Sequence, residues 1–180
     1  GYDSIGKFIN TGNVVAHKGW VYFSTAGESM ENSGVLLSQE GNVYLGCDGI
    51  ITNSGAITAE DQNVAIAANG IKNHATIEAQ KSVFLLSTNN IYNGKNENLL
   101  TANIDENDIH IFAGDDILLL TAEGLENKAK LAAGVNITDG TKGHGGDIFL
   151  DDYEFLSTPD KLDDDTKGFL TYLVGGYWSG

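Results

Sequence analysis

The sequence predicts an all-β protein, a right-handed parallel β-helix of about six coils with an irregular carboxy-terminal portion. An asparagine-centred motif recurs along the chain, apolar pairs with a period of two follow each motif, and 23 glycines interrupt the sequence. Period-two alternation is typical of strands that bury one face. Frequent Gly and Asn-Gly breaks argue against helices.

The repeat is anchored on asparagine. Its six copies read FINTGNVVA, MENSGVLLS, ITNSGAITA, IKNHATIEA, IYNGKNENLLTA and LENKAKLAA, with anchors at Asn10, Asn32, Asn53, Asn73, Asn93 and Asn127. Successive anchors are 22, 21, 20, 20 and 34 residues apart. Because stacked coils present equivalent residues to one another, we expect these amides to form a ladder at one corner. The alternative is asparagines that only tolerate a left-handed turn.

Two apolar pairs follow each anchor, and we interpret them as two strands facing a shared core. In the unit of Asn53, the pairs are Ile57 with Ala59 and Val64 with Ile66. Strands this short cannot bury a core alone, so the coils must stack on their neighbours.

The pattern degrades after residue 93. We expect β-helix over residues 1–150, regular over 8–93 and with insertions over 94–150, and then an acidic connector and apolar end over 151–180 that packs on or extends the solenoid. In the long interval, the first strand pair is predicted at Leu100 and Ala102, the second at Ile109, Ile111 and Ala113, and ILLL adds a further strand. GVNITDGTKGHGGDIFL reads as a glycine-rich protrusion, where the register is lost.

The motifs ITNSGAITA, IKNHATIEA and ENSGVLLS, with the strands NVAIA and SVFLL, resemble the haemagglutinin repeats of filamentous-haemagglutinin-type exoproteins. The resemblance covers about residues 8–137. It implies a β-helical adhesin or contact-dependent inhibition stalk, secreted to the bacterial cell surface by two-partner secretion. Its implied partners are the parent protein's outer-membrane transporter and a receptor or glycan on a host or neighbouring cell. The Asn-Pro-Asn motifs of the family's secretion domain are absent, which suggests an interior shaft piece.

The net charge of the chain limits which other kinds of partner it can bind. Twenty-five acidic residues face ten basic ones, all of them lysine, for a formal charge of -15. A polyanion is repelled by this field, and the bidentate fork of arginine is missing, so we expect neither nucleic-acid binding nor membrane binding or insertion. The single cysteine, Cys47, is predicted to be a small core residue.

The sequence predicts no catalytic residue, metal or cofactor, because nucleophile elbows, phosphate loops and Cys/His metal spacings are missing. We expect ordinary surface positions for the four histidines, which are His17, His74, His110 and His144. Adventitious calcium binding stays open for Asp105, Asp108, Asp147, Asp151 and Asp152.

The alternative function is a polysaccharide-active enzyme, a lyase or hydrolase, in which carboxylates of adjacent coils converge. The nearest approach to such a set is Glu60 with Asp61 and their neighbour Glu40, which we interpret as solvated surface. A third possibility is a receptor-binding or toxin-carrying specialisation in residues 94–180.

Large aromatic residues recur at one outward position. Alignment of the second strands places Tyr22, Tyr44, Ala65, Phe84 and His110 in one column, with Trp20 beside Tyr22. Rows of exposed aromatic rings are uncommon on soluble surfaces and suit stacking on sugars or a protein partner. We therefore predict ligand binding by Trp20, Tyr22, Tyr44 and Phe84. The alternative is a column covered by the chain itself, through residues 138–147 or the end segment FLTYLVGGYW. The predicted function is a non-enzymatic, rigid shaft and adhesion surface.

Overall fold

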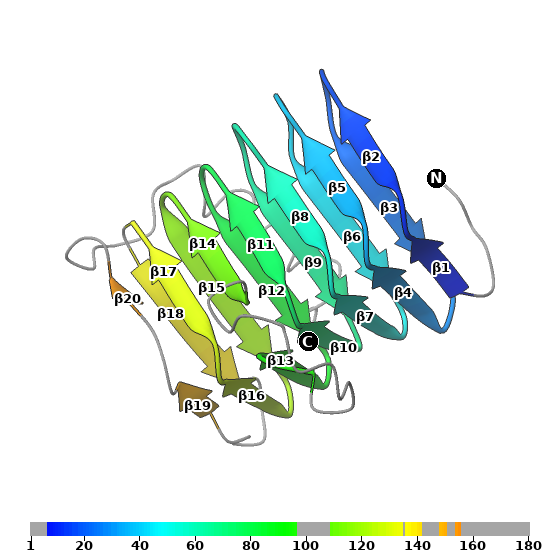
Figure 1. Cartoon of the computed structure of the whole chain (residues 1–180). Coiled ribbons are helices and arrows are strands. Elements are labelled where there is room, and N and C mark those ends of the chain that lie inside the picture. Colours follow the sequence, from blue (N-terminus) through cyan, green and yellow to red (C-terminus); the bar gives the residue numbers. More distant parts are fainter. Residues whose placement is uncertain (1–6, 97–108, 135, 142–147, 151–153, 156–180) are drawn as a thin grey trace.

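The computed structural model describes residues 7–96, 109–134, 136–141, 148–150 and 154–155. Every element in these residues is a strand, and the strands form three parallel sheets along a solenoid (Figure 1). The predicted all-β, parallel β-helical class is confirmed.

Each coil contributes one strand to each sheet. Sheet A contains β1 (Lys7–Asn10), β4 (Ser29–Asn32), β7 (Ile50–Asn53), β10 (Gly70–Asn73), β13 (Asn90–Asn93), β16 (Gly124–Asn127) and β19 (Ile148–Leu150). Sheet B contains β2 (Asn13–Ala16), β5 (Val35–Ser38), β8 (Ala56–Ala59), β11 (Thr76–Ala79), β14 (His110–Ala113), β17 (Lys130–Ala133) and β20 (Glu154–Phe155). Sheet C contains β3 (Val21–Thr25), β6 (Val43–Cys47), β9 (Val64–Ala68), β12 (Val83–Ser87), β15 (Asp116–Thr121) and β18 (Asn136–Thr141).

The register places equivalent residues of successive coils side by side. Ile57 pairs with Leu36 on one neighbouring coil and with Ile77 on the other, and all three side chains are buried. Sheets A and B alternate buried and more exposed positions, as period-two strands with one covered face do. The buried sets of the three sheets meet in one continuous apolar core.

The six anchor asparagines form a column at the corner between sheets A and B. Each side-chain Nδ2 donates to Oδ1 of the asparagine on the next coil, with N–O distances of 2.8, 2.9, 2.9, 2.8 and 2.7 Å from Asn10 to Asn127. All six are buried. An amide can fill this position because it both donates and accepts, so one residue type repeats through the whole stack.

A second column closes the corner between sheets C and A. There, Thr25, Cys47, Ser87 and Thr121 each accept a hydrogen bond from a backbone N–H two residues further on. Cys47 Sγ also donates to the Gly27 carbonyl at 3.3 Å. Cys47 is therefore buried as predicted, and it also takes the place that a hydroxyl takes on other coils.

The strand assignments within the long interval were wrong by one sheet. Ile111 and Ala113 pair with Ile77 and Ala79, so they form the first strand of their coil and not the second. The second strand is β15, which contains ILLL and pairs with β12 as a regular member of sheet C. Leu100 and Ala102 lie outside the described residues.

The register also continues beyond residue 134. β18 pairs with β15 in sheet C, β19 pairs with β16 in sheet A, and β20 pairs with β17 in sheet B. Much of the expected protrusion is therefore solenoid strand. Of residues 151–180, the structure describes only β20, which extends sheet B.

Candidate functional site

The outward column of sheet C begins as predicted and then differs. Tyr22 pairs with Tyr44, Tyr44 with Ala65, and Ala65 with Phe84. The next member is Leu118, which pairs with Phe84. His110 belongs to sheet B, where it pairs with Thr76 and Lys130. The sequence pattern had assigned its strand to sheet C.

Burial divides this column into two parts. Phe84 is 0% exposed, and a second apolar cluster surrounds it on the outward face of sheet C. The buried members of that cluster are Ala65, Ala67, Phe84, Leu86 and Leu118. The expected exposure of Phe84 was therefore wrong, and at this position the alternative of a covered column holds. The two segments expected to cover the column, residues 138–147 and FLTYLVGGYW, lie outside the residues whose side chains are described.

The first coils keep a partly exposed aromatic surface, which we call the aromatic patch and which consists of exposed Trp20, exposed Tyr22 and half-buried Tyr44. Trp20 is 48% exposed and Tyr22 is 51% exposed. The rings of Tyr22 and Tyr44 stack with centroids 4.9 Å apart and 15° between their planes. Trp20 lies close to Gly41, where an added Cβ would stand 2.9 Å from Trp20 Cδ1. The patch therefore has one ring pair in fixed geometry and an indole beside it.

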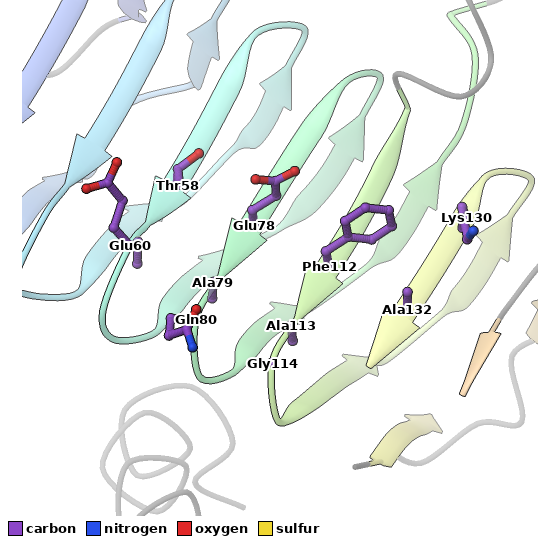
Figure 2. A pocket seen from close by; sticks show the side chains of 11 residues that line it. Thr58, Glu60, Glu78, Ala79, Gln80, Phe112, Ala113, Gly114, Lys130 and Ala132 are labelled. Atoms are coloured by element: carbon purple, nitrogen blue, oxygen red, sulfur yellow. The ribbon is translucent and has the colours of Figure 1, made fainter. Parts of the chain in front are cut away.

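A groove of about 670 Å³ crosses the outward face of sheet B, and we call it the sheet B groove (Figure 2). Thr58, Glu78, Phe112 and Ala132 pair in register across four coils and form its row of outward side chains. Glu60, Gln80, Gly114 and Lys130 also line it. Asp61 and Glu40, the other carboxylates of the predicted acidic set, are not among the lining residues.

One polar cluster fixes the middle of the groove. His110 Nε2 lies 2.7 Å from Glu78 Oε1, and the His110 ring stacks on Phe112 with centroids 3.9 Å apart. The His110–Glu78 contact joins β14 to β11 of the neighbouring coil, and the ring stacking within β14 holds Phe112, which pairs with Ala132 of the next coil. The sequence pattern did not reveal this groove because Phe112 was assigned to the wrong strand, although alignment of NHATIEAQ with DIHIFAG would have shown it.

The described parts of the chain contain side chains of the kinds that hold metal ions. No three His, Cys, Asp or Glu side chains among them lie close enough together to hold an ion. The five aspartates considered for calcium lie outside the described residues. Nor do the described residues include a helix of the length and hydropathy needed to span a membrane.

His74 departs from the expectation that the histidines are surface residues. Its side chain belongs to the buried set at 8% exposure, and Nδ1 lies 2.7 Å from the carbonyl oxygen of Gly94. A carbonyl can only accept, so Nδ1 must carry the hydrogen.

Comparison with known proteins finds no match: no family model, no curated protein and no solved structure is similar to the chain.

Proposed function

We propose that this chain is a non-enzymatic segment of a secreted bacterial surface exoprotein, a rigid β-helical shaft that also displays an adhesive surface. The repeat resemblance described above supports the secreted, two-partner class and its outer-membrane transporter. The ligand is a receptor or glycan on another cell. The observation that carries the adhesive part is the aromatic patch, in which Trp20 and Tyr22 stand exposed and half-buried Tyr44 stacks on Tyr22.

The shaft role follows from the physics of stacked coils. In the described residues, the strands of each coil pair with those of the neighbouring coils, and the asparagine ladder adds buried side-chain bonds between coils. Such a stack resists bending because a bend would open one row of these bonds. A rigid rod can hold a binding surface away from the membrane that bears it.

The adhesive role follows from the chemistry of the patch. Aromatic faces and edges pack against the apolar faces of sugar rings and against apolar protein side chains. Exposed rings that are already ordered lose little conformational entropy on binding, so a small patch can contribute useful affinity. Many copies on one cell surface would multiply weak individual contacts.

The test compares two double variants for binding to intact cells and to a glycan array. Tyr22→Ser with Tyr44→Ser removes the stacked pair, whereas Ile9→Ser with Ile50→Ser removes exposed apolar side chains from sheet A. We expect the tyrosine variant to lose most binding and the isoleucine variant to keep it. The melting curve should be nearly unchanged for the isoleucine variant and only slightly lowered for the tyrosine variant, because Tyr44 is partly buried. Equal retention by both variants would contradict the adhesive role. A large stability loss in the tyrosine variant would show that the patch is internal packing.

The enzymatic alternative gains one specific observation, because Glu60 and Glu78 from neighbouring coils both line the sheet B groove (Figure 2). Paired carboxylates across a groove are what glycoside hydrolysis requires. The measurement is release of reducing ends from neutral and acidic polysaccharides by the wild type and by Glu60→Gln and Glu78→Gln. Release that both variants abolish supports an enzyme. No release from any polysaccharide supports the non-enzymatic proposal.

A further inference from the structure

A small cationic pocket lies at the corner between sheets A and B, in a molecule that is otherwise strongly acidic. It has a volume of about 270 Å³ and is lined by Lys72, His74, Tyr92, Lys95, Asn96, Glu126 and Lys128. Three of the ten lysines in the chain therefore line one pocket with a single carboxylate. Like charges repel, so this gathering opposes the distribution that a solvated surface would favour.

A glycine in the corner column allows the lining residues of the pocket to come close together. His74, Gly94 and Lys128 each follow a ladder asparagine, and their backbone N–H groups donate to the coil before. An added Cβ on Gly94 would stand 2.9 Å from Tyr92 Oη and 3.1 Å from Lys128 Cβ. Glycine therefore lets Tyr92 and Lys128 approach the corner, where they line the pocket together with His74 from two coils before Lys128.

Hydrogen bonds hold the walls of the cationic pocket in place. Tyr92 Oη donates to the carbonyl of Lys95 at 2.8 Å, which fixes the backbone that carries one lysine. His74 Nδ1 donates to the carbonyl of Gly94 at 2.7 Å, which fixes the imidazole. Lys72, Tyr92 and Glu126 pair in register on the outward face of sheet A. Hydrogen bonds to backbone carbonyls thus fix Tyr92 and His74, and the sheet register places Lys72 and Glu126 on either side of Tyr92.

Several of these donors lack a partner within the described part of the chain. His74 uses Nδ1 for Gly94, and its Nε2 has no hydrogen bond there although the residue is only 8% exposed. Lys72 and Lys95 make no ion pair with any described residue, whereas Lys128 Nζ lies 2.9 Å from Glu126 Oε1. A buried ring nitrogen without a partner is costly, and a ligand group that bonds to it would remove that cost.

We propose that this pocket binds a small oxyanion, the carboxylate, sulfate or phosphate group of a ligand. Lys72 and Lys95 supply charge-assisted bonds, and Lys128 shares its ammonium between Glu126 and the anion. Because His74 Nδ1 carries a hydrogen, the neutral ring accepts at Nε2 from a hydroxyl of the ligand, and only the charged ring donates there to the anion. Tyr92 forms an aromatic wall for the body of the ligand. The volume is near the lower end of ligand pockets, which span about 300 to 1,000 Å³, so it suits a monosaccharide-sized acid. The overall negative charge of the protein still repels long polyanions, so the pocket should prefer ligands that have a single anionic group.

The experiment titrates the 180-residue chain separately with inorganic sulfate, inorganic phosphate and D-glucuronate at constant ionic strength, and follows affinity by calorimetry and the His74 ring signals by NMR. The test variant is Lys72→Gln with Lys95→Gln. The matched control is Lys18→Gln with Lys81→Gln, which removes the same charge from exposed lysines beside the corner between sheets B and C.

We expect saturable binding of at least one probe, with shifted His74 signals, and about tenfold weaker binding in the test variant because charge-assisted bonds are lost. The control variant keeps the wild-type affinity. Binding of glucuronate alone assigns the pocket to carboxylates, and binding of sulfate or phosphate assigns it to tetrahedral anions. No saturable binding of any probe, or equal affinities in the two variants, would overturn the proposal.

Discussion

Each ladder asparagine satisfies several buried groups at once. Asn53 Nδ2 lies within bonding distance of Asn73 Oδ1 at 2.9 Å and of the Thr76 carbonyl at 3.0 Å. Its Oδ1 accepts from Asn32 Nδ2 at 2.9 Å and from the N–H of Gly55 at 3.3 Å. The residue is 1% exposed, so none of these partners can turn to water when the amide is removed.

Replacement of Asn53 by leucine is therefore expected to lower the free energy of unfolding by about 2–4 kcal/mol, because the neighbouring amides lose their partners while buried. Chemical denaturation measures the loss. Asn13→Leu serves as the control, since Asn13 is exposed and outside the ladder, and it should change stability by less than about 0.5 kcal/mol. Equal losses in the two variants would refute the ladder as a stabilising feature.

Cys47 provides a second prediction at the residue scale. Burial raises the pKa of its thiol above the ordinary value of 9.0, the Gly49 N–H bond lowers it in part, and Asp48 raises it. Because the folded pKa exceeds the unfolded pKa, the thiol stabilises the fold below the unfolded pKa, and this contribution is lost as the pH rises through the folded value. Alkylation by iodoacetamide at pH 8 should accordingly be slow in the native protein and fast in urea.

The same corner predicts that Cys47→Ser is tolerated. Ser87 and Thr121 occupy the equivalent place on other coils and accept the same type of bond with an oxygen. The change in unfolding free energy should stay within about 1 kcal/mol, whereas Cys47→Val, which loses the acceptor, should cost more. A serine variant as unstable as the valine variant would show that only the volume of the thiol matters.

At the scale of the element, sheet C differs from the other two sheets. β9 and β12 are buried on both faces, whereas β3 in the same sheet leaves Tyr22 exposed. We expect Phe84→Ala to lower the free energy of unfolding by about 3–5 kcal/mol, since a fully buried ring is removed. Tyr22→Ala should cost at most about 1 kcal/mol. Similar costs for the two variants, read from denaturation curves, would contradict the division of the column.

The strands were largely predictable from sequence where every coil has the same residue type at the equivalent position. The asparagine ladder could be found because only an amide both donates and accepts, so every coil uses the same residue. The corner with Thr25, Cys47 and Ser87 could not be found in this way, because a hydroxyl or a thiol can fill the position and the residue type therefore differs between coils. The coil after Asn93 was misread because IHIFA and ILLL both alternate like a strand, and sequence does not show where an insertion ends.

The candidate sites were less predictable than the strands. Alignment placed Tyr22, Tyr44 and Phe84 in one column, yet it could not show that Phe84 is covered, since burial depends on segments distant in sequence. The cationic pocket could not be predicted from the net charge of the chain, because the net charge does not show where lysines gather. Its lysines are spread between positions 72 and 128 and meet only when the coils stack.

At the scale of the whole molecule, the formal charge of -15 opposes compaction. The ion pairs Lys7–Glu31 and Lys128–Glu126 are each nearly half exposed and offset little of this repulsion. Raising NaCl from about 0.01 M to 0.3 M should therefore increase the melting temperature, because screening shortens the range of the repulsion. A melting temperature that falls with added salt would indicate that attractive ion pairs dominate.

Parallel stacking of coils in register underlies the ladder, both corner columns, the aromatic patch and the cationic pocket. Nuclear Overhauser contacts between backbone protons test it most directly. The account predicts contacts between Ile57 and Ile77 and between Val64 and Val83, whose partners lie 20 and 19 residues apart in sequence. Cross-strand contacts that instead join sequence-adjacent strands in antiparallel order would contradict it.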